Sequence, residues 1–262
     1  MPKAYLTIDD SPSAHTDALT DALAARNVPA LLFCRGDRLK KNPEPIVTAI
    51  RKGFVIGNHA WSHTRFSTLS LEDGTKEIKK TDKLIDNAYR KAGVQRSAKY
   101  FRFPHMDRGC GGWVVDYDDL LPSYRDALVQ LFGGGLNVQL TPPDRAMKLK
   151  KQALQDWLKD EGFQSPDFRG VPHSWYNDTE VATAIDTMFT YSTGDWMVTA
   201  RHLGKWPYKS VDDLKAKIDA DPFLHKDGSH IVLMHDQDEL LDVGIALVDH
   251  LIAKGFVFQK IP

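Results

Sequence analysis

Two short runs in this 262-residue chain bring together residue types that could bind a metal ion and activate water. The run Thr7-Ile8-Asp9-Asp10-Ser11-Pro12 places two aspartates at the end of an apolar, β-prone segment. The run Asn58-His59-Ala60-Trp61-Ser62-His63 places two histidines four residues apart. One aspartate and two histidines supply three of the four ligands of a tetrahedral zinc, which leaves the open position that a catalytic site needs. The spare aspartate is then the natural base for a water molecule.

Each run also has a purely structural explanation. His59 and His63 stand at i and i+4, where a helical turn would place both on one side, and they could be a capping or surface pair. Asp9 and Asp10 could end a strand or cap a helix, because Ser11-Pro12-Ser13 follows them. A turn or cap accounts for one carboxylate, whereas two adjacent acids repel each other and are costly to bury without a cation. The two runs together therefore favour a metal site.

Alternating strand and helix patterns predict the elements that position these residues. If the strands form one parallel sheet with helical crossovers, the fold is α/β. If that sheet closes into a barrel, its site lies at the C-terminal ends of the strands. Asp9, Asp10, His59, His63 and Arg102 all lie near or just after the end of a predicted strand. The apolar patterns predict strands at 5–8, 28–33, 54–57, 99–103, 229–234 and 256–258, and helices at 16–26, 44–52, 72–91, 114–132, 146–161 and 239–254.

Composition narrows the function classes. The 34 lysines and arginines nearly balance 35 aspartates and glutamates, and no basic stripe appears, which argues against a nucleic-acid partner. No apolar run approaches the roughly 20 residues that span a bilayer. We find no charged and apolar leader with a cleavage site, so we expect a cytoplasmic protein unless a signal has been removed. Cys34 is expected to be a buried thiol, and a disulfide between Cys34 and Cys110 is left open.

Five motifs, in order along the chain, resemble those of the polysaccharide deacetylase family, also known as the NodB-homology domain or carbohydrate esterase family 4. The pattern T-F-D-D-G-P is similar to Thr7 to Pro12, and H-[ST]-x-x-H is similar to His59 to His63. The arginine-proline motif resembles Arg102-Phe103-Pro104-His105, the Asp-Trp motif resembles Asp195-Trp196, and the last motif resembles Leu233-Met234-His235. The resemblance covers nearly the whole chain.

The resemblance implies a distorted (β/α) barrel and metal-dependent hydrolysis of an N-acetyl or related amide on a sugar. It implies that Asp10, His59 and His63 hold one divalent ion, which we expect to be zinc, with cobalt, manganese or nickel as alternatives. It further implies that Asp9 is the general base and that Arg102 pairs with Asp9. His235 would be the general acid, and Asp195 would orient it and keep it protonated.

The same resemblance implies a set of residues that bind the substrate. The backbone N–H of His105 would help stabilise the oxyanion. Trp196 and Leu233 would line a small pocket for the acyl methyl group. The substrate-binding residues implied by these motifs are Pro104, His105, Trp196 and Leu233. His173 and Trp175 lie outside the motifs, but an aromatic cluster of this kind could stack on a sugar face.

The sequence departs from the family pattern at several points. Ser11 replaces a glycine, Ala60 replaces a hydroxyl residue, and His105 replaces an aromatic residue. Residues 110–190 form a longer segment between the third and fourth motifs, and we expect it to be a helical insertion that caps the active site within a single domain of residues 1–262. With no export signal found, a small or lipid-linked amide is expected rather than a cell-wall polymer.

Two other functions remain open at this stage. The family also includes hydrolases of cyclic imides and ureides, which a panel of substrates would separate from sugar deacetylases. The second alternative is a catalytically silent carbohydrate-binding domain. The loss of Asp9, of His235 or of a metal ligand would have favoured it, but all of these residues are present. The oligomeric state and the exact substrate are not predicted.

Overall fold

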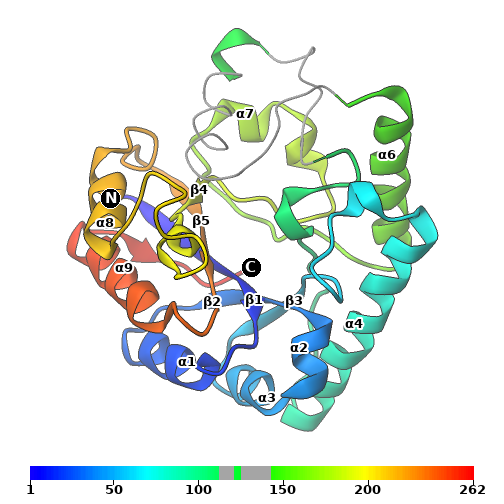
Figure 1. Ribbon diagram of the computed structural model, residues 1–262, viewed down its shortest axis with the longest axis horizontal. Helices are drawn as coiled ribbons and strands as arrows, with labels where there is room; N and C mark the ends of the chain where they lie inside the picture. The colour runs from blue at the N-terminus through cyan, green and yellow to red at the C-terminus, as the bar shows by residue number, and fades with distance from the viewer. Residues whose placement is uncertain (112–120, 125–142) are drawn as a thin grey trace.

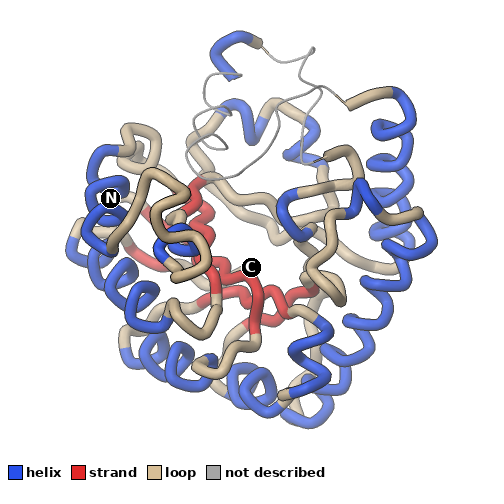
Figure 2. Tube along the Cα trace, viewed as in Figure 1, coloured by secondary structure: helices blue, strands red, loops and turns tan. Residues whose placement is uncertain are grey.

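The computed structural model describes residues 1–111, 121–124 and 143–262. Helices surround a central group of parallel strands, as Figures 1 and 2 show. The strands are β1 (Lys3–Ser11), β2 (Ala30–Cys34), β3 (Val55–Asn58), β4 (Tyr191–Ser192), β5 (Ser229–His235) and β6 (Val257–Phe258). The α-helices are α1 (Thr16–Ala25), α2 (Gly36–Lys41), α3 (Glu44–Arg51), α4 (Leu71–Ala92), α6 (Arg145–Asp160), α7 (Ser174–Asn177), α8 (Val211–Ala220) and α9 (Leu241–Ala253). The short 3₁₀ turns are η1 (Phe66–Thr68), η2 (Pro104–Met106), η4 (Glu180–Thr183) and η5 (Asp195–Val198).

The strand order is β3-β2-β1-β5-β4, with β6 pairing to the start of β1. All of these pairings are parallel, which confirms the predicted α/β class. The ladder is open between β3 and β4, but two extended segments lie between them. Asn58 of β3 bonds to Tyr100 and Arg102, the Thr187 N–H bonds to the Phe101 carbonyl, and the Thr190 N–H bonds to Ile231 of β5. Backbone hydrogen bonds therefore continue around the ring of a distorted barrel.

The fourth predicted strand, at 99–103, is wrong as a regular strand. Its residues are extended but form only two isolated bridges, from Phe101 to Asn58 and from Lys99 to Phe163. Its backbone groups bond to three different segments, so no two consecutive pairs form a ladder. Pro104 then ends the segment, because proline has no N–H to continue the pairing.

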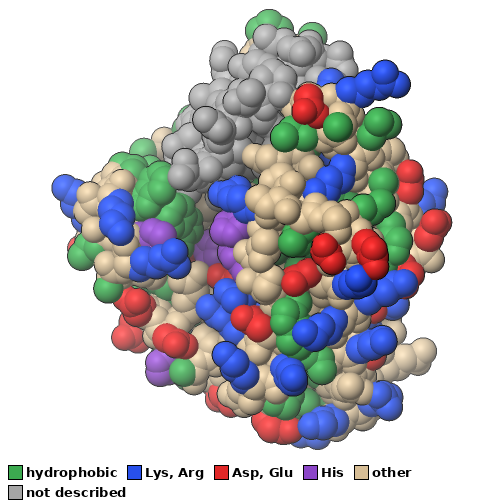
Figure 3. Space-filling model, turned by 45° about the vertical axis from the view of Figure 1, so that its right-hand side comes forward, with side chains coloured by type: hydrophobic (Ala, Val, Ile, Leu, Met, Phe, Trp, Pro, Cys, Tyr) green, Lys and Arg blue, Asp and Glu red, His purple; other side chains and the backbone are tan. Residues whose placement is uncertain are grey.

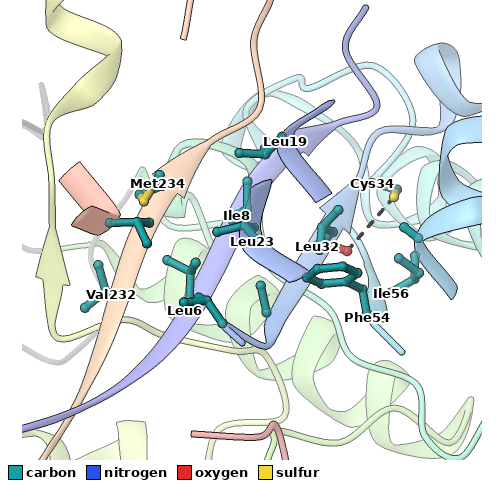
Figure 4. Close-up of a cluster of buried hydrophobic side chains, with 14 of the residues drawn as sticks. Leu6, Ile8, Leu19, Leu23, Leu32, Cys34, Phe54, Ile56, Val232 and Met234 are labelled. Carbon is teal, nitrogen blue, oxygen red and sulfur yellow. Dashed lines mark hydrogen bonds between the residues drawn. The ribbon is translucent and has the colours of Figure 1, made fainter. Parts of the chain in front are cut away.

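The strands carry apolar side chains on both faces, as expected for a covered parallel sheet. Leu6, Ile8, Leu32, Ile56 and Val232 point outward and pack against the helices. Figure 4 shows this cluster together with two leucines of α1. The alternate residues point into the ring, where Tyr5, Ile231 and Leu233 form one cluster and Leu31, Phe33 and Tyr100 form another. The ring interior is therefore packed beneath the C-terminal ends of the strands.

The long helix α4 follows from the sequence in a simple way. Ser70 caps its N-terminus by accepting the Asp73 N–H, and Gly93 ends it in the left-handed conformation. Ile78 and Ile85 are buried on its inner face. Helix α6 lies beside α4 in Figure 1 and packs through Leu154 and Leu158, which shows that this part of the 110–190 segment belongs to the outer layer.

The helix expected at 114–132 falls mainly outside the described residues, and the proposed cap and the single-domain assignment remain predictions. In the part of the chain that the structure describes, no helix is both long and apolar enough to cross a bilayer. The cellular location remains a prediction from the sequence. Cys34 and Cys110 are buried and are not joined by a disulfide.

Candidate active site

Three predicted metal ligands meet at the C-terminal ends of β1 and β3. Asp10 lies in β1, and His59 and His63 follow β3 directly. The Asp10 Oδ1 atom lies 3.4 Å from His63 Nε2. One potential ligand atom from each of the three residues lies within 4.8 Å of the others, a spacing at which one ion can contact all three. The strand ends thus bring together residues that are about fifty positions apart in the sequence.

Hydrogen bonds orient these three side chains. The Arg102 carbonyl accepts a hydrogen bond from His59 Nδ1 at 2.8 Å, which leaves Nε2 of the same ring with its lone pair free. Gln237 donates to Asp10 Oδ2 at 2.8 Å. Asp10 Oδ1 is buried and has no hydrogen-bond partner among the described residues. A buried carboxylate oxygen without a partner is costly, so this geometry fits a cation at Oδ1.

The electrostatics favour the charge states that a metal ion needs. Burial lowers the pKa of His63 to about 2, against the opposing effect of Asp10. Burial also lowers the pKa of His59, so both imidazoles are neutral near pH 7. Burial alone would raise the pKa of Asp10, but positive charge around it, including that of His235 and Arg38, holds it well below its usual value. The set therefore presents one carboxylate and two neutral rings.

Asp9 points to a different partner from its neighbour Asp10. The Arg102 Nη1 atom donates to Asp9 Oδ1 at 2.9 Å and to the Thr7 hydroxyl at 2.9 Å. Arg102 is fully buried, and its other N–H groups bond to the carbonyls of Thr187 and Met188. The guanidinium also stacks 4.5 Å from the centre of the Phe33 ring. Arg102 therefore holds Asp9 from inside the ring, and the two form a buried ion pair.

His235 and Asp195 form a second buried pair at the end of β5. The imidazole Nδ1–H donates to Asp195 Oδ1 at 2.7 Å, and the His235 backbone N–H donates to Asp195 Oδ2 at 2.7 Å. The Trp196 N–H also donates to Oδ1, which fixes the carboxylate from a second side. Burial would lower the pKa of His235, but Asp195, with Asp10 and Asp9 nearby, raises it to about 9. The ring is therefore protonated at neutral pH.

A pocket of about 510 Å³ joins these groups. Asp9, Asp10, His59, His63 and His235 lie in its wall. In Figure 3, histidine side chains gather in a recess, with lysine or arginine side chains beside it. The size and the mixed lining are typical of a small-molecule site.

The other residues that the sequence suggested for substrate binding divide into two groups. His105, Trp196 and Leu233 line the pocket, whereas Pro104 is buried beside it and does not. His173 and Trp175 are buried and away from the pocket lining, and His173 Nε2 lies 3.4 Å from His230 Nδ1. The suggestion that His173 and Trp175 stack on a sugar is therefore not supported by their placement.

The sequence reasoning missed several residues around the metal set and along the pocket. Arg38 donates to the carbonyls of Asp10 and Asp236, and Gln237 holds Asp10 Oδ2. The remaining residues that line the pocket and were not singled out as site residues include Arg35, His202 and Trp206. Arg35, Arg38 and Gln237 follow β2 or β5 within a few residues, so the strand-end rule could have found them. His202 and Trp206 come from a long connection after η5, where the sequence carries no such signal.

The backbone around the site is unusual. Among the described non-glycine residues with positive φ, five of six lie here, and the sixth is Asn27. They are Asp10, Ala60, His63, His105 and Met106. A positive φ costs energy for most residues, and such outliers cluster where a fold aims functional side chains.

Comparison with known proteins agrees with this arrangement. The family profile described as polysaccharide deacetylase matches residues 1–109. A chitooligosaccharide deacetylase from Rhizobium leguminosarum bv. trifolii is 33% identical over 168 residues, which span 58% of this chain and 78% of that protein.

Two solved structures share the fold. A family 4 carbohydrate esterase from Streptomyces lividans, in complex with acetate, matches with a TM-score of 0.55 at 17% identity, over 99% of this chain and 93% of that one. A family 4 pseudoenzyme from Bacillus anthracis matches with a TM-score of 0.57 at 16% identity, over 97% of this chain and 62% of that one. Because these identities are low, the structural matches bear on the fold alone. The family profile and the chitooligosaccharide deacetylase relative lead to one assignment: this chain belongs to the polysaccharide deacetylase family.

Proposed function

We propose that this protein is a metal-dependent amide hydrolase that removes an N-acetyl or related N-acyl group from an amino sugar or a sugar conjugate. The observation that carries the proposal is the convergence on one pocket of a three-ligand set, a carboxylate held by arginine and a protonated histidine. The similarity to a chitooligosaccharide deacetylase supports the choice of an acylated sugar.

The donor set suits a divalent ion. Two neutral imidazole nitrogens and one carboxylate oxygen are ligands that zinc accepts readily, and cobalt, manganese or nickel can replace it at such sites. Asp10, His59 and His63 would hold the ion, with Gln237 and the Arg102 carbonyl fixing the ligand orientations. When bound, the ion would supply Lewis acidity for the acyl carbonyl and for water.

Asp9 would take the proton from the attacking water. Its Oδ1 is held by Arg102, and its Oδ2 lies 3.7 Å from His59 Nε2, so the free oxygen borders the metal set. A carboxylate oxygen that is held in place beside the metal set is positioned to accept a proton from water.

His235 would give a proton to the departing amine. Amide cleavage needs this proton because an amine anion is a poor leaving group. Asp195 orients the ring through Nδ1 and leaves Nε2–H as the donor toward the pocket. Leu233 and Trp196, which lie in the pocket wall, would border the acyl group.

Metal removal tests the proposal. We expect chelation to abolish hydrolysis of N-acetylated chitooligosaccharides, and added Zn²⁺ or Co²⁺ to restore it, with metal content followed by elemental analysis. Full activity of a metal-free sample would contradict the proposed chemistry. If the protein hydrolysed cyclic imides but no N-acyl sugar, the same residues would be assigned to a cyclic imide hydrolase. Sugar binding without turnover in the metal-loaded protein would favour a silent binding domain.

A further inference from the structure

The pocket carries more positive charge than the proposed reaction uses. Four arginines line it, namely Arg35, Arg38, Arg65 and Arg201, against three acids, Asp9, Asp10 and Glu239. The proposed metal ion would add further positive charge, so the excess of positive charge is a property of the working site.

The acids of the pocket are already occupied. Asp9 pairs with Arg102, and Asp10 belongs to the metal set. Glu239 Oε2 accepts the backbone N–H of Ala200 at 2.7 Å. Arg35 Nη1 lies 3.9 Å from Asp10 Oδ1, but among the described residues none of the three carboxylates forms an ion pair with Arg65 or Arg201.

Two of the arginines are also committed. Arg35 makes two hydrogen bonds to Asp37, at 3.2 and 2.8 Å, which balance its charge. Arg38 donates to the backbone carbonyls of Asp10 and Asp236 and supports the loop beside the metal set.

Arg65 and Arg201 differ from that pair. Within the described parts of the chain, neither guanidinium has a carboxylate within 4.0 Å or a hydrogen bond to a protein acceptor. Arg65 follows the ligand His63 and adjoins η1, and Arg201 lies in the connection after η5. Two free guanidinium groups thus border one pocket from different segments.

The same walls carry groups that suit a sugar ring. Trp196 and Trp206 pack edge to face with their centroids 5.0 Å apart, beside His202. Trp206 Nε1 is buried and has no hydrogen-bond partner among the described residues. Aromatic faces and a spare N–H donor offer a surface for an amphipathic ring with acceptor oxygens.

We propose that Arg65 and Arg201 select an N-acylated sugar that carries an anionic group, a phosphate or a carboxylate, on or next to the acylated unit. Guanidinium groups bind both anions through paired N–H donors, and an excess of positive charge in a pocket concentrates anionic substrates. This inference rests on the proposed deacetylase function and specifies its substrate class. A neutral chitin-like sugar would leave both arginines without partners.

Binding of sugars that cannot be turned over tests the inference apart from catalysis. The probes are glucose, glucose 6-phosphate and galacturonic acid, which carry no amine and differ in the anionic group, titrated calorimetrically into the metal-loaded protein. We expect the anionic sugars to bind at least about tenfold more tightly than glucose, the size of one charged hydrogen bond. If only the phosphate sugar binds more tightly, the arginines form a phosphate site. If both anionic sugars bind more tightly, the arginines form a general anion site.

The variants R65Q and R201Q should each reduce the anionic-to-neutral affinity ratio about tenfold, while R65K should retain part of it. The matched control is R169Q. Arg169 is exposed and pairs with Asp167. Its neighbour Gly170 bonds to Ser229 at the N-terminal end of β5, which is the end opposite the site. R169Q should leave the ratio unchanged. Thermal unfolding of each variant checks that it folds. Equal affinity of the wild type for neutral and anionic sugars, or an unchanged ratio in both R65Q and R201Q, would overturn the inference.

Hydrolysis separates this inference from the function on which it rests. N-acetylglucosamine, its 6-phosphate, N-acetylgalactosaminuronic acid and neutral chitotriose are compared by kcat/KM. Hydrolysis without preference for either anionic sugar would leave the deacetylase function intact and overturn the inference. Preferential anion binding without hydrolysis of any N-acyl sugar would leave the arginine site intact and remove the proposed function.

Discussion

Asp9 and Asp10 are adjacent in sequence, yet their side chains have different partners. Asp10 adopts a φ of 70°, which turns it toward the histidines, while Asp9 meets Arg102 inside the ring. Because a sequence shows only two neighbouring acids, the division of their roles depends on this local turn in the backbone.

The division of roles predicts different failures for two matched variants. Asp9→Asn should retain metal but lose about 10²–10⁴-fold in kcat, the usual contribution of a general base. Asp10→Asn should lose metal, because a neutral amide is a weak ligand. Metal content and kcat are measured on both. The assignment would be wrong if the two variants behaved alike in both measurements.

His235 should matter in proportion to how much the leaving group needs a proton. We expect His235→Ala to lose far more activity on an N-acetyl amide than on an aryl acetate, whose phenolate leaves without help. Asp195→Asn should show the same bias more weakly, since it acts through the imidazole. The measurement is the amide-to-ester ratio of kcat/KM. Equal losses on both substrates would remove His235 from the acid role.

The His235–Asp195 pair also predicts how stability depends on pH in the metal-free protein. The folded pKa of about 9 lies above the ordinary value of 6.5, so the pair stabilises the fold fully below pH 6.5, and this contribution disappears as pH rises through 9. The upper limit is about 3 kcal/mol. Chemical unfolding of the wild type and His235→Gln between pH 6 and 10 measures the difference. An unfolding free-energy gap that is constant with pH would contradict the raised pKa.

Most of the geometry of the candidate site was predictable from the sequence. Asp9, Asp10, His59, His63 and His235 all stand where a motif meets a strand end, and they line one pocket. Arg102 and Asp195 are buried behind it and bond to Asp9 and His235. His202, Trp206 and Arg201 were not predictable, because long connections carry no periodicity that fixes where they fold.

At the scale of elements, the close approach of β2 and β3 supports Arg102, which holds the proposed base Asp9. A Cβ atom on Gly57 would lie 2.5 Å from the Phe33 ring, and that ring stacks under Arg102. In the sequence, Gly57 stands near a strand end, where a glycine is equally consistent with a simple turn. Only the packed structure shows that the missing side chain makes room for the ring beneath the arginine.

Gly57→Ala should therefore affect both stability and catalysis. Overpacking of this kind costs about 1–3 kcal/mol, and movement of Phe33 should disturb Arg102 and lower kcat. Gly244→Ala is the matched control, because its Cβ would meet only the flexible end of Met234. Urea unfolding and kcat are measured on both variants. A Gly57→Ala protein with wild-type stability and rate would show that this contact is not needed.

The elements that the sequence missed differ in cause. Helix α2 has six residues, too few to show an extended apolar period. Helix α8 carries Leu214 and Ile218 at helical spacing behind a Ser210–Asp213 capping box, a signal that could have found it. Strand β4 has two residues. Segment 99–103 has the β-prone composition of a strand, but its partners change from residue to residue. The local sequence pattern predicts an extended conformation for this segment. It cannot specify which distant backbone segments form hydrogen bonds with it.

At the scale of the whole molecule, β1 organises the fold. It pairs with β2 on one side and β5 on the other, so the two ends of the chain meet along it. The parallel class and the placement of chemistry at one end follow from strand–helix alternation. The closure of the ring cannot be predicted from this alternation. It depends on single hydrogen bonds between residues such as Phe101 and Thr187, which are far apart in sequence.

The residues with positive φ at the site have a consequence for local opening of the native structure. The positive φ values of Asp10, Ala60, His63, His105 and Met106 concentrate conformational strain on one rim, while the strands below are well packed. In the metal-free protein this rim should open locally before the barrel unfolds, and a bound ion should close it again. Amide hydrogen exchange should then be fast around residues 59–65 and 104–107 without metal and become slow with it, while β1 and β5 stay protected in both states. Uniform exchange across rim and strands would show that the strain is not released locally.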